Sequence, residues 1–212
     1  MVLNYDTQIF DFQEQLKAYL EVEDLSKLHE TKDFDVTKVL TRENDTKTKY
    51  HKAFYRLFEL GAFRSTYNKF IMKYMGDVLY QTIPNIRFHF PNNVGVGEFH
   101  KDSDFGHDIN EINYIIPLTD MWGTNSVWVE EYPNQGFYHP MRLNLGDFIQ
   151  FSGATLKHGS KINDTDYTRV SFDFRTIKKE HFIPGKETIN GIKKFEVGSY
   201  WSDVLQIVSK YL

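Results

Sequence analysis

A ten-residue stretch, FHKDSDFGHD (99–108), gathers two histidines and three aspartates in an otherwise hydrophobic part of the chain. On a β-strand, His100 and Asp102 share a face, because alternate residues of a strand point the same way. A third nitrogen ligand is available at His158, within the stretch LKHGS. These three side chains could hold one metal ion, although any solvated acidic loop that contains a histidine produces H-x-D as well.

A second set of polar residues follows His158 by eleven positions. Arg169 and Ser171, in TRVSF, share a strand face, and Asp173 and Arg175 continue it. An inward-facing arginine needs an anion, since an unpaired buried charge is very costly. A guanidinium beside a hydroxyl group is suited to bind the end of a dicarboxylate. The alternative is a purely structural ion pair of Arg169 with Asp173 or with a glutamate.

Other polar residues near these motifs are candidates for substrate or co-substrate contacts. Asn113, in EINYIIPL, could contact a co-substrate or order the surroundings of the metal, or simply make an ordinary strand hydrogen bond. Arg87 and His89 alternate on one face of NIRFHF, which favours either substrate binding or ordinary pairing. Arg175 is a further candidate for substrate contact.

Three more candidates lie in the predicted loops and strands. His107 follows Gly106 in a predicted loop, where a side chain contacts substrate or solvent. Trp128 and Glu130 share a face in VWVEE, where the tryptophan belongs to the core or forms a platform for substrate.

The composition limits what kind of protein this is. The 212 residues are enough for one domain with a sizeable core, and 41% of them are hydrophobic. Because there is no cysteine, zinc–thiolate sites, iron–sulfur clusters and disulfides are excluded, and any metal must be held by nitrogen and oxygen. A net charge of -4 argues against a nucleic-acid partner. The start MVLNYDTQIF is not a signal peptide and no stretch is long enough to span a membrane, so we expect a cytoplasmic protein.

The pattern of hydrophobic residues predicts a mainly β fold of the α+β class. Residues 1–80 carry helical spacing in 11–22 and 50–79, joined by a polar connection over 29–49. Residues 81–178 carry short β-type runs separated by turn residues, typical of a sandwich or jelly-roll. We expect strands within the ranges 85–90, 96–102, 111–118, 126–131, 137–143, 146–152, 156–162 and 168–177. Residues 179–212 complete the single predicted domain as a loop-rich closing segment with a final short helix.

The motifs together resemble those of the Fe(II)/2-oxoglutarate-dependent oxygenases. The resemblance is carried by HKD at 100–102, HG at 158–159 and RVS at 169–171, with GDFIQF preceding the second motif. Over residues 80–177 the chain resembles, more narrowly, the StrG-like branch associated with streptomycin biosynthesis. Two histidines and one carboxylate, with the other positions open to a co-substrate and dioxygen, are the facial ligand set of this class.

The resemblance implies a double-stranded β-helix (jelly-roll) core against which the N-terminal helices pack. It implies iron held by His100, Asp102 and His158, and 2-oxoglutarate chelated to the iron with its far carboxylate at Arg169 and Ser171. O2 would convert 2-oxoglutarate to succinate and hydroxylate an unactivated C–H of a small polar metabolite, such as an amino acid, a sugar or a natural-product intermediate. The presence of Asp102 disfavours halogenation.

Two other functions stay open. The same scaffold could hydroxylate a protein or peptide, or a cupin-like protein could bind metal or sugar without redox chemistry. The Arg169–Ser171 pair argues against the second alternative, because a simple binding module needs no dicarboxylate anchor. Substrate identity, oligomeric state and the choice between hydroxylation, desaturation and cyclisation are left open.

Overall fold

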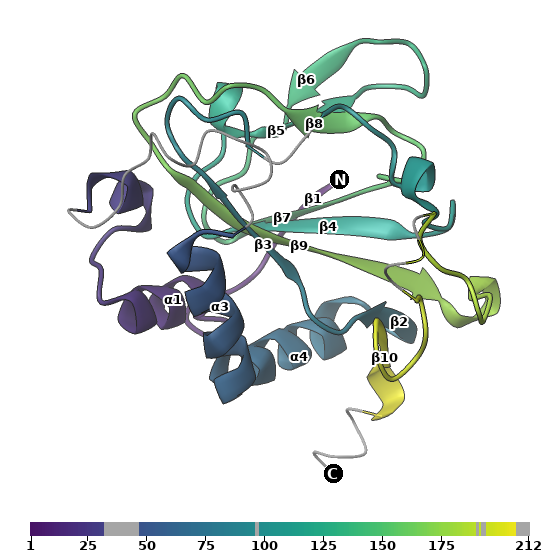
Figure 1. The fold of residues 1–212 in the computed structure, drawn as a ribbon. Coiled ribbons are helices and arrows are strands. Elements are labelled where there is room, and N and C mark those ends of the chain that lie inside the picture. The colour runs from purple at the N-terminus through teal and green to yellow at the C-terminus, as the bar shows by residue number, and fades with distance from the viewer. Residues whose placement is uncertain (32–46, 96–97, 190, 192–193, 207–212) are drawn as a thin grey trace.

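Two antiparallel β-sheets and a layer of helices make up the fold (Figure 1). The computed structural model describes residues 1–31, 47–95, 98–189, 191 and 194–206. The larger sheet has seven strands, in the spatial order β1 (Val2–Asn4), β7 (Asp147–Phe151), β4 (Ile112–Pro117), β9 (Arg169–Lys178), β2 (Val78–Gln81) and β10 (Trp201–Asp203), with β3 (Asn85–His89) also paired to β9. The smaller sheet has three, in the order β6 (Tyr138–Pro140), β5 (Val127–Glu130) and β8 (His158–Ser160).

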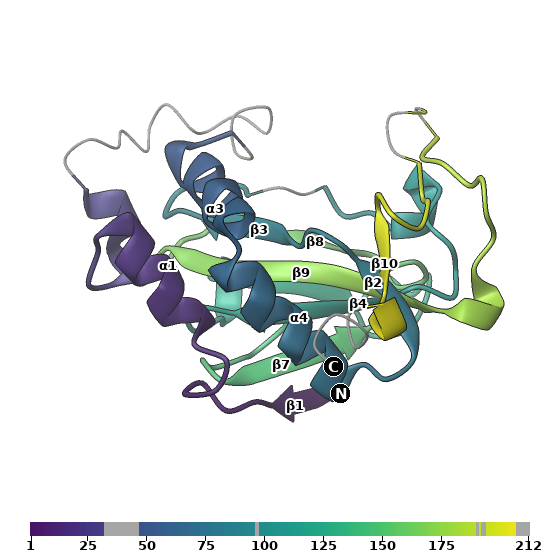
Figure 2. The ribbon, with the colours of Figure 1, turned by 90° about the horizontal axis from the view of Figure 1, so that it is seen from below.

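Within the described residues, three α-helices cover one face of the larger sheet, and the smaller sheet lies over the other face (Figures 1 and 2). The helices are α1 (Phe12–Leu20), α3 (Lys49–Leu60) and α4 (Ala62–Tyr74). The break between α3 and α4 falls at Gly61, whose φ of 100° lies in the left-handed region that glycine adopts without steric cost. Among the described residues, no helix is long and apolar enough to cross a membrane.

The core between helices and sheet is built from aromatic side chains. Phe172, on β9, is fully buried and lies 5.0 Å from the ring of Phe12 and 5.7 Å from that of Phe63. Because strand residues alternate in direction, the neighbours Ser171 and Asp173 point to the opposite face, toward the smaller sheet. Strand β9 therefore separates an apolar helical layer from a polar interior.

The mainly β class predicted from the sequence is confirmed, and so are seven of the eight expected strands. The expectation of a strand at 96–102 is wrong for its described part, because His100 forms only an isolated bridge to His158 and Asp102 begins a 3-10 helix, Asp102–Phe105. Residues 96–97 lie outside the described residues, as do 32–46 of the expected polar connection.

Strands β1, β2 and β10 were not expected from the sequence, yet they join the larger sheet. β1 lies in the part expected to be helical, and β10 lies in the closing segment. Short 3-10 helices at Leu25–Glu30, Gly123–Asn125 and Lys179–His181 complete the described elements. The sheet thus draws strands from all three parts of the chain.

Candidate metal centre

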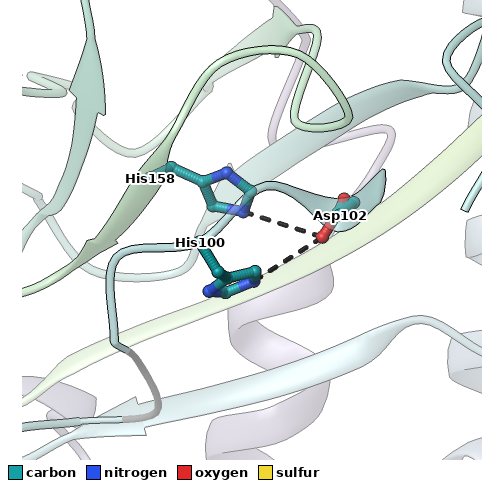
Figure 3. A group of neighbouring side chains, drawn as sticks. All are labelled: His100, Asp102 and His158. Carbon is teal, nitrogen blue, oxygen red and sulfur yellow. Dashed lines mark ion pairs between the residues drawn. The ribbon is translucent and has the colours of Figure 1, made fainter. Parts of the chain in front are cut away.

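The side chains of His100, Asp102 and His158 converge between the two sheets (Figure 3). Asp102 Oδ1 lies 3.7 Å from His100 Nε2 and 3.8 Å from His158 Nε2. All three ligand atoms lie within 4.8 Å of one another, so bonds of about 2.0–2.2 Å to one ion need only small side-chain rotations. The donor set of two imidazoles and one carboxylate fits iron(II), which leaves other coordination positions open.

The backbone fixes both histidines relative to each other. His100 N donates to His158 O over 3.0 Å, and His158 N donates back to His100 O over 2.9 Å. Each ring also places Nδ1 next to a carbonyl oxygen, Glu98 O at 2.7 Å and Leu156 O at 3.1 Å. An Nδ1–H that donates to these carbonyls leaves Nε2 as the lone-pair nitrogen, which is the tautomer a metal requires.

Asp102 reaches the same point because the chain turns after Lys101. Its backbone N–H donates to Gly153 O over 2.9 Å, and Ser103 Oγ donates to Ala154 O over 2.7 Å. The carboxylate therefore converges with His100 through a 3-10 turn tied to residues 153–154, and not through strand alternation.

The second oxygen of Asp102 is held by two buried donors. Asn113 Nδ2 donates to Oδ2 over 2.6 Å, and Arg175 Nε donates to the same oxygen over 2.9 Å. Burial alone would raise the pKa of Asp102, but the Arg175 guanidinium and the His100 contact outweigh burial and hold that pKa well below its ordinary value. The side chain is thus an ionised carboxylate whose Oδ2 is hydrogen-bonded to Asn113 and Arg175 and whose Oδ1 faces the two histidines.

The two histidines differ in their own pKa shifts. Burial lowers the pKa of His158. At His100 the effect of burial is outweighed by hydrogen bonds to Asp102 and to Glu98 O, which raise the pKa.

A cavity of about 280 Å³ opens beside these ligands. The side of β9 that faces it carries four polar side chains in register, Arg169, Ser171, Asp173 and Arg175. Arg169 and Ser171 are buried, and Arg169 Nη1 donates to Ser171 Oγ over 2.7 Å. The pair is therefore presented to the same space as the metal ligands.

Two further predicted residues, Arg87 and His89, line the cavity from β3. Arg87 Nε donates to Asp173 Oδ1 over 2.8 Å. Asp173 thus pairs with Arg87, and not with Arg169 as in the structural ion pair that was the alternative to dicarboxylate binding. The ring nitrogens of His89 face Asn93 O at 2.8 Å and Asn125 O at 3.3 Å. Burial, aided by the charge of Arg169, lowers the pKa of His89 to about 4, so the ring is neutral.

Three predicted substrate contacts are not brought to the cavity. His107 Nδ1 lies 2.7 Å from Glu111 Oε2. Trp128 Nε1 donates to Gly123 O over 3.1 Å, and the Lys161 ammonium lies 3.3 Å from the centre of its ring. Glu130 is buried and accepts hydrogen bonds from the backbone N–H groups of Gly136 and Lys157. All three side chains are engaged elsewhere in the fold.

Two glycines also shape the centre. A Cβ on Gly153 would lie 2.6 Å from Asn113 Nδ2, and a Cβ on Gly159 would lie 3.0 Å from the backbone of Phe99. Only glycine fits these positions without displacing a neighbour. Gly159 belongs to the HG motif, whereas nothing in the sequence indicates that Gly153 lies next to Asn113.

Two histidines and a carboxylate at the edge of a cavity between antiparallel sheets form the donor set with which non-heme iron(II) oxygenases hold their metal. No protein-family model matches the chain. The streptomycin biosynthesis protein StrG of Streptomyces griseus is 35% identical over 207 residues, which cover 95% of this chain and 97% of StrG. The chain belongs to the StrG family.

Solved structures with similar folds are much more distant in sequence. The non-heme alpha-ketoglutarate-dependent epimerase SnoN from nogalamycin biosynthesis is 12% identical, with a TM-score of 0.49 over 96% of this chain and 93% of SnoN. The nickel complex of the non-heme monooxygenase ThoJ is 13% identical, with a TM-score of 0.47 over 98% of this chain and 88% of ThoJ. At these scores the similarity carries no functional information.

Proposed function

We propose that the chain is an Fe(II)/2-oxoglutarate-dependent dioxygenase with a double-stranded β-helix core that hydroxylates an unactivated C–H of a small polar metabolite. The observation that carries the proposal is the position of Arg169 and Ser171 on the wall of the cavity that His100 and His158 also line. A protein that only bound metal would have no need for a buried guanidinium and hydroxyl directed at the same space.

Separate groups of residues would bind the iron and the 2-oxoglutarate. His100, Asp102 and His158 would hold the iron, while Arg169 and Ser171 would bind the far carboxylate of 2-oxoglutarate and so direct its keto acid end toward the metal. Bound iron and 2-oxoglutarate together supply the oxidising power: one O2 is consumed, one oxygen atom enters the substrate C–H bond, and 2-oxoglutarate leaves as succinate and CO2. Phe151 and Ile115 add apolar side chains to the lining of the same cavity.

Asp102 keeps its charge throughout because its second oxygen is bonded to Arg175 and Asn113. That oxygen is therefore not available as a base, and the carboxylate binds metal through Oδ1. The neutral ring of His89 carries one N–H, which can donate to Asn93 O over 2.8 Å and so hold the loop around Asn93 in place.

The size of the cavity supports a small substrate. A volume of about 280 Å³ lies at the lower end of small-molecule sites and is too small to enclose a folded protein segment. The name of StrG connects that relative to streptomycin biosynthesis, and a biosynthetic role for this chain is part of the proposal. The expectation of a cytoplasmic location stays a prediction.

The proposal is tested by turnover of 2-oxoglutarate in the absence of substrate. Purified protein with Fe(II), ascorbate and 2-oxoglutarate should form succinate slowly, and His158→Ala and Arg169→Ala should abolish the reaction. Arg142→Ala, at an exposed arginine, is the matched control and should react as the wild type does. Wild-type protein that binds iron but neither binds nor consumes 2-oxoglutarate would overturn the proposal.

A further inference from the structure

Within the described residues, only part of the Arg87 guanidinium is hydrogen-bonded to the protein. It lies opposite Ser171 in the register of β3 and β9, and it lines the cavity. Its Nε donates to Asp173 Oδ1, while Asn85 Nδ2 donates to Asp173 Oδ2 over 2.9 Å. Within the part of the chain that the structure describes, no hydrogen bond involves the two terminal nitrogens of Arg87, and 28% of the side chain is exposed.

This arrangement fixes the direction of the guanidinium. Asp173 is itself held by the Asn85 amide, and it binds Arg87 through Nε at the base of the planar group. The two terminal amino groups are therefore a preorganised fork, and a fork of this kind matches a carboxylate or a phosphate through two parallel hydrogen bonds.

Positive side chains gather along this side of the cavity. Arg87, Arg169 and Arg175 all line it. Asp173 pairs with Arg87, and Arg175 faces the carboxylates of Asp102 and Glu111. Guanidinium groups in a partly enclosed space favour a substrate that carries a negative group.

We propose that Arg87 binds a carboxylate or phosphate group of the substrate, and that the substrate is therefore an anionic metabolite. This inference rests on the proposed function and narrows it. The anchor lies across the β3–β9 ladder from Ser171, next to the proposed site of 2-oxoglutarate but on a different strand from its guanidinium, Arg169. An anionic group held there places the rest of the molecule in the cavity beside the metal ligands.

The test uses methyl phosphate and acetate as probes and methanol as the neutral control. Binding to the full chain is measured by ligand-observed NMR at constant ionic strength, with Mn(II) in place of iron and with 2-oxoglutarate present. Both anions should bind the wild type, and methanol should not. Arg87→Gln should weaken anion binding at least about tenfold, as expected when hydrogen bonds to a charged group are lost.

Two further variants show whether a loss of anion binding comes from the missing guanidinium or from damage to the fold. The double variant Arg87→Gln/Asp173→Asn removes both charges together, so that no buried carboxylate is left unpaired, and should lose anion binding like Arg87→Gln. Arg142→Gln, at an exposed arginine, should bind both anions as the wild type does.

The affinity for 2-oxoglutarate, measured in the same series, separates this inference from the proposed function. Both Arg87 variants should bind 2-oxoglutarate within about twofold of the wild type. Equal anion binding by wild type and Arg87→Gln, no anion binding by the wild type, or a parallel loss of 2-oxoglutarate affinity would each overturn the role of Arg87. A wild type that binds methyl phosphate through Arg87 but does not bind 2-oxoglutarate would instead contradict the proposed function.

Discussion

Arg175 and Asp102 form a buried ion pair in which Arg175 Nε donates to Asp102 Oδ2 over 2.9 Å. The pair joins the C-terminal half of β9 to the 3-10 turn that carries Asp102, the candidate iron ligand. With Oδ2 engaged, only Oδ1 faces the two histidines. The arginine that the sequence suggested as a substrate contact thus lies where it can orient the metal site.

Replacing Arg175 should weaken metal binding without removing any ligand. Arg175→Met removes one of the two hydrogen bonds that hold Asp102 Oδ2 and leaves only that from Asn113, so the carboxylate is less firmly oriented. The loss of such an outer contact typically costs about 10–100-fold in metal affinity. Calorimetric titration with Mn(II) at fixed pH measures the effect, with Arg142→Met as control. Arg175→Lys, which keeps the charge, should recover part of the affinity. Unchanged affinity in Arg175→Met would show that Arg175 does not position Asp102.

A methyl group added at Gly153 should disturb the other hydrogen bond to the Asp102 carboxylate, the one from Asn113. Its Cβ would lie 2.6 Å from Asn113 Nδ2, so Gly153→Ala should push the amide away from Asp102. We expect a loss of metal affinity close to that of Asn113→Ala, and little additional loss when the two changes are combined, because both remove one contact. Additive losses in the Mn(II) titration would contradict this coupling.

Ser171 should affect 2-oxoglutarate and not the metal. Ser171→Ala removes one hydrogen bond to a charged carboxylate, worth about 1.5 kcal/mol or more, or roughly tenfold or more in the dissociation constant. Mn(II) affinity should be unchanged, since the hydroxyl group of Ser171 accepts from Arg169 and, within the described residues, makes no hydrogen bond to any of the three ligands. Equilibrium dialysis with labelled 2-oxoglutarate measures the first quantity and calorimetry the second; a selective loss of Mn(II) affinity would exclude this role.

Two buried histidines should make the metal-free protein less stable in acid. Burial, with a contribution from Arg87, lowers the pKa of His51 to about 3, and burial lowers that of His89 to about 4. The unfolded chain binds protons at both sites below about pH 6.5, whereas the folded chain stays neutral there until pH 4 or lower. Their contribution to stability is therefore complete above pH 6.5 and falls as the pH drops, by about 1.4 kcal/mol per pH unit for each histidine.

Urea unfolding of wild type and His51→Gln checks this dependence. Between pH 5.5 and 4.5 the free energy of unfolding of the variant should fall less steeply than that of the wild type, by about 1.4 kcal/mol per pH unit. His181→Gln, at an exposed histidine, should keep the wild-type slope. Equal slopes in all three proteins would rule out a protonation-linked role for His51.

The sequence could predict strand β9 and its polar face because polar and apolar residues alternate along it, and this alternation indicates a strand whatever the details of its packing. Arg169, Ser171, Asp173 and Arg175 alternate with Val170, Phe172 and Phe174, and the structure places the first set at the cavity and buries the second set. The spacing also singled out His100, Asp102 and His158, which converge in space.

The partners of these residues could not be predicted, because they are set by long-range contacts. Nothing in HKD indicates that the chain turns at Asp102 under the control of Gly153 O, or that Arg175 reaches back to Asp102. Strands β1 and β10 were missed for a similar reason: each forms by pairing with a strand that is distant in sequence, β1 with β7 and β10 with β2.

The central claim is that one metal and one 2-oxoglutarate bind together in the cavity, and equilibrium binding of 2-oxoglutarate with and without Mn(II) tests it most directly. Wild-type protein should bind one equivalent of 2-oxoglutarate per chain in a strictly metal-dependent manner, and both His158→Ala and Arg169→Ala should lose it, with Arg169→Ala keeping its Mn(II). Binding of 2-oxoglutarate that is independent of metal, or that survives in Arg169→Ala at wild-type affinity, would contradict the account.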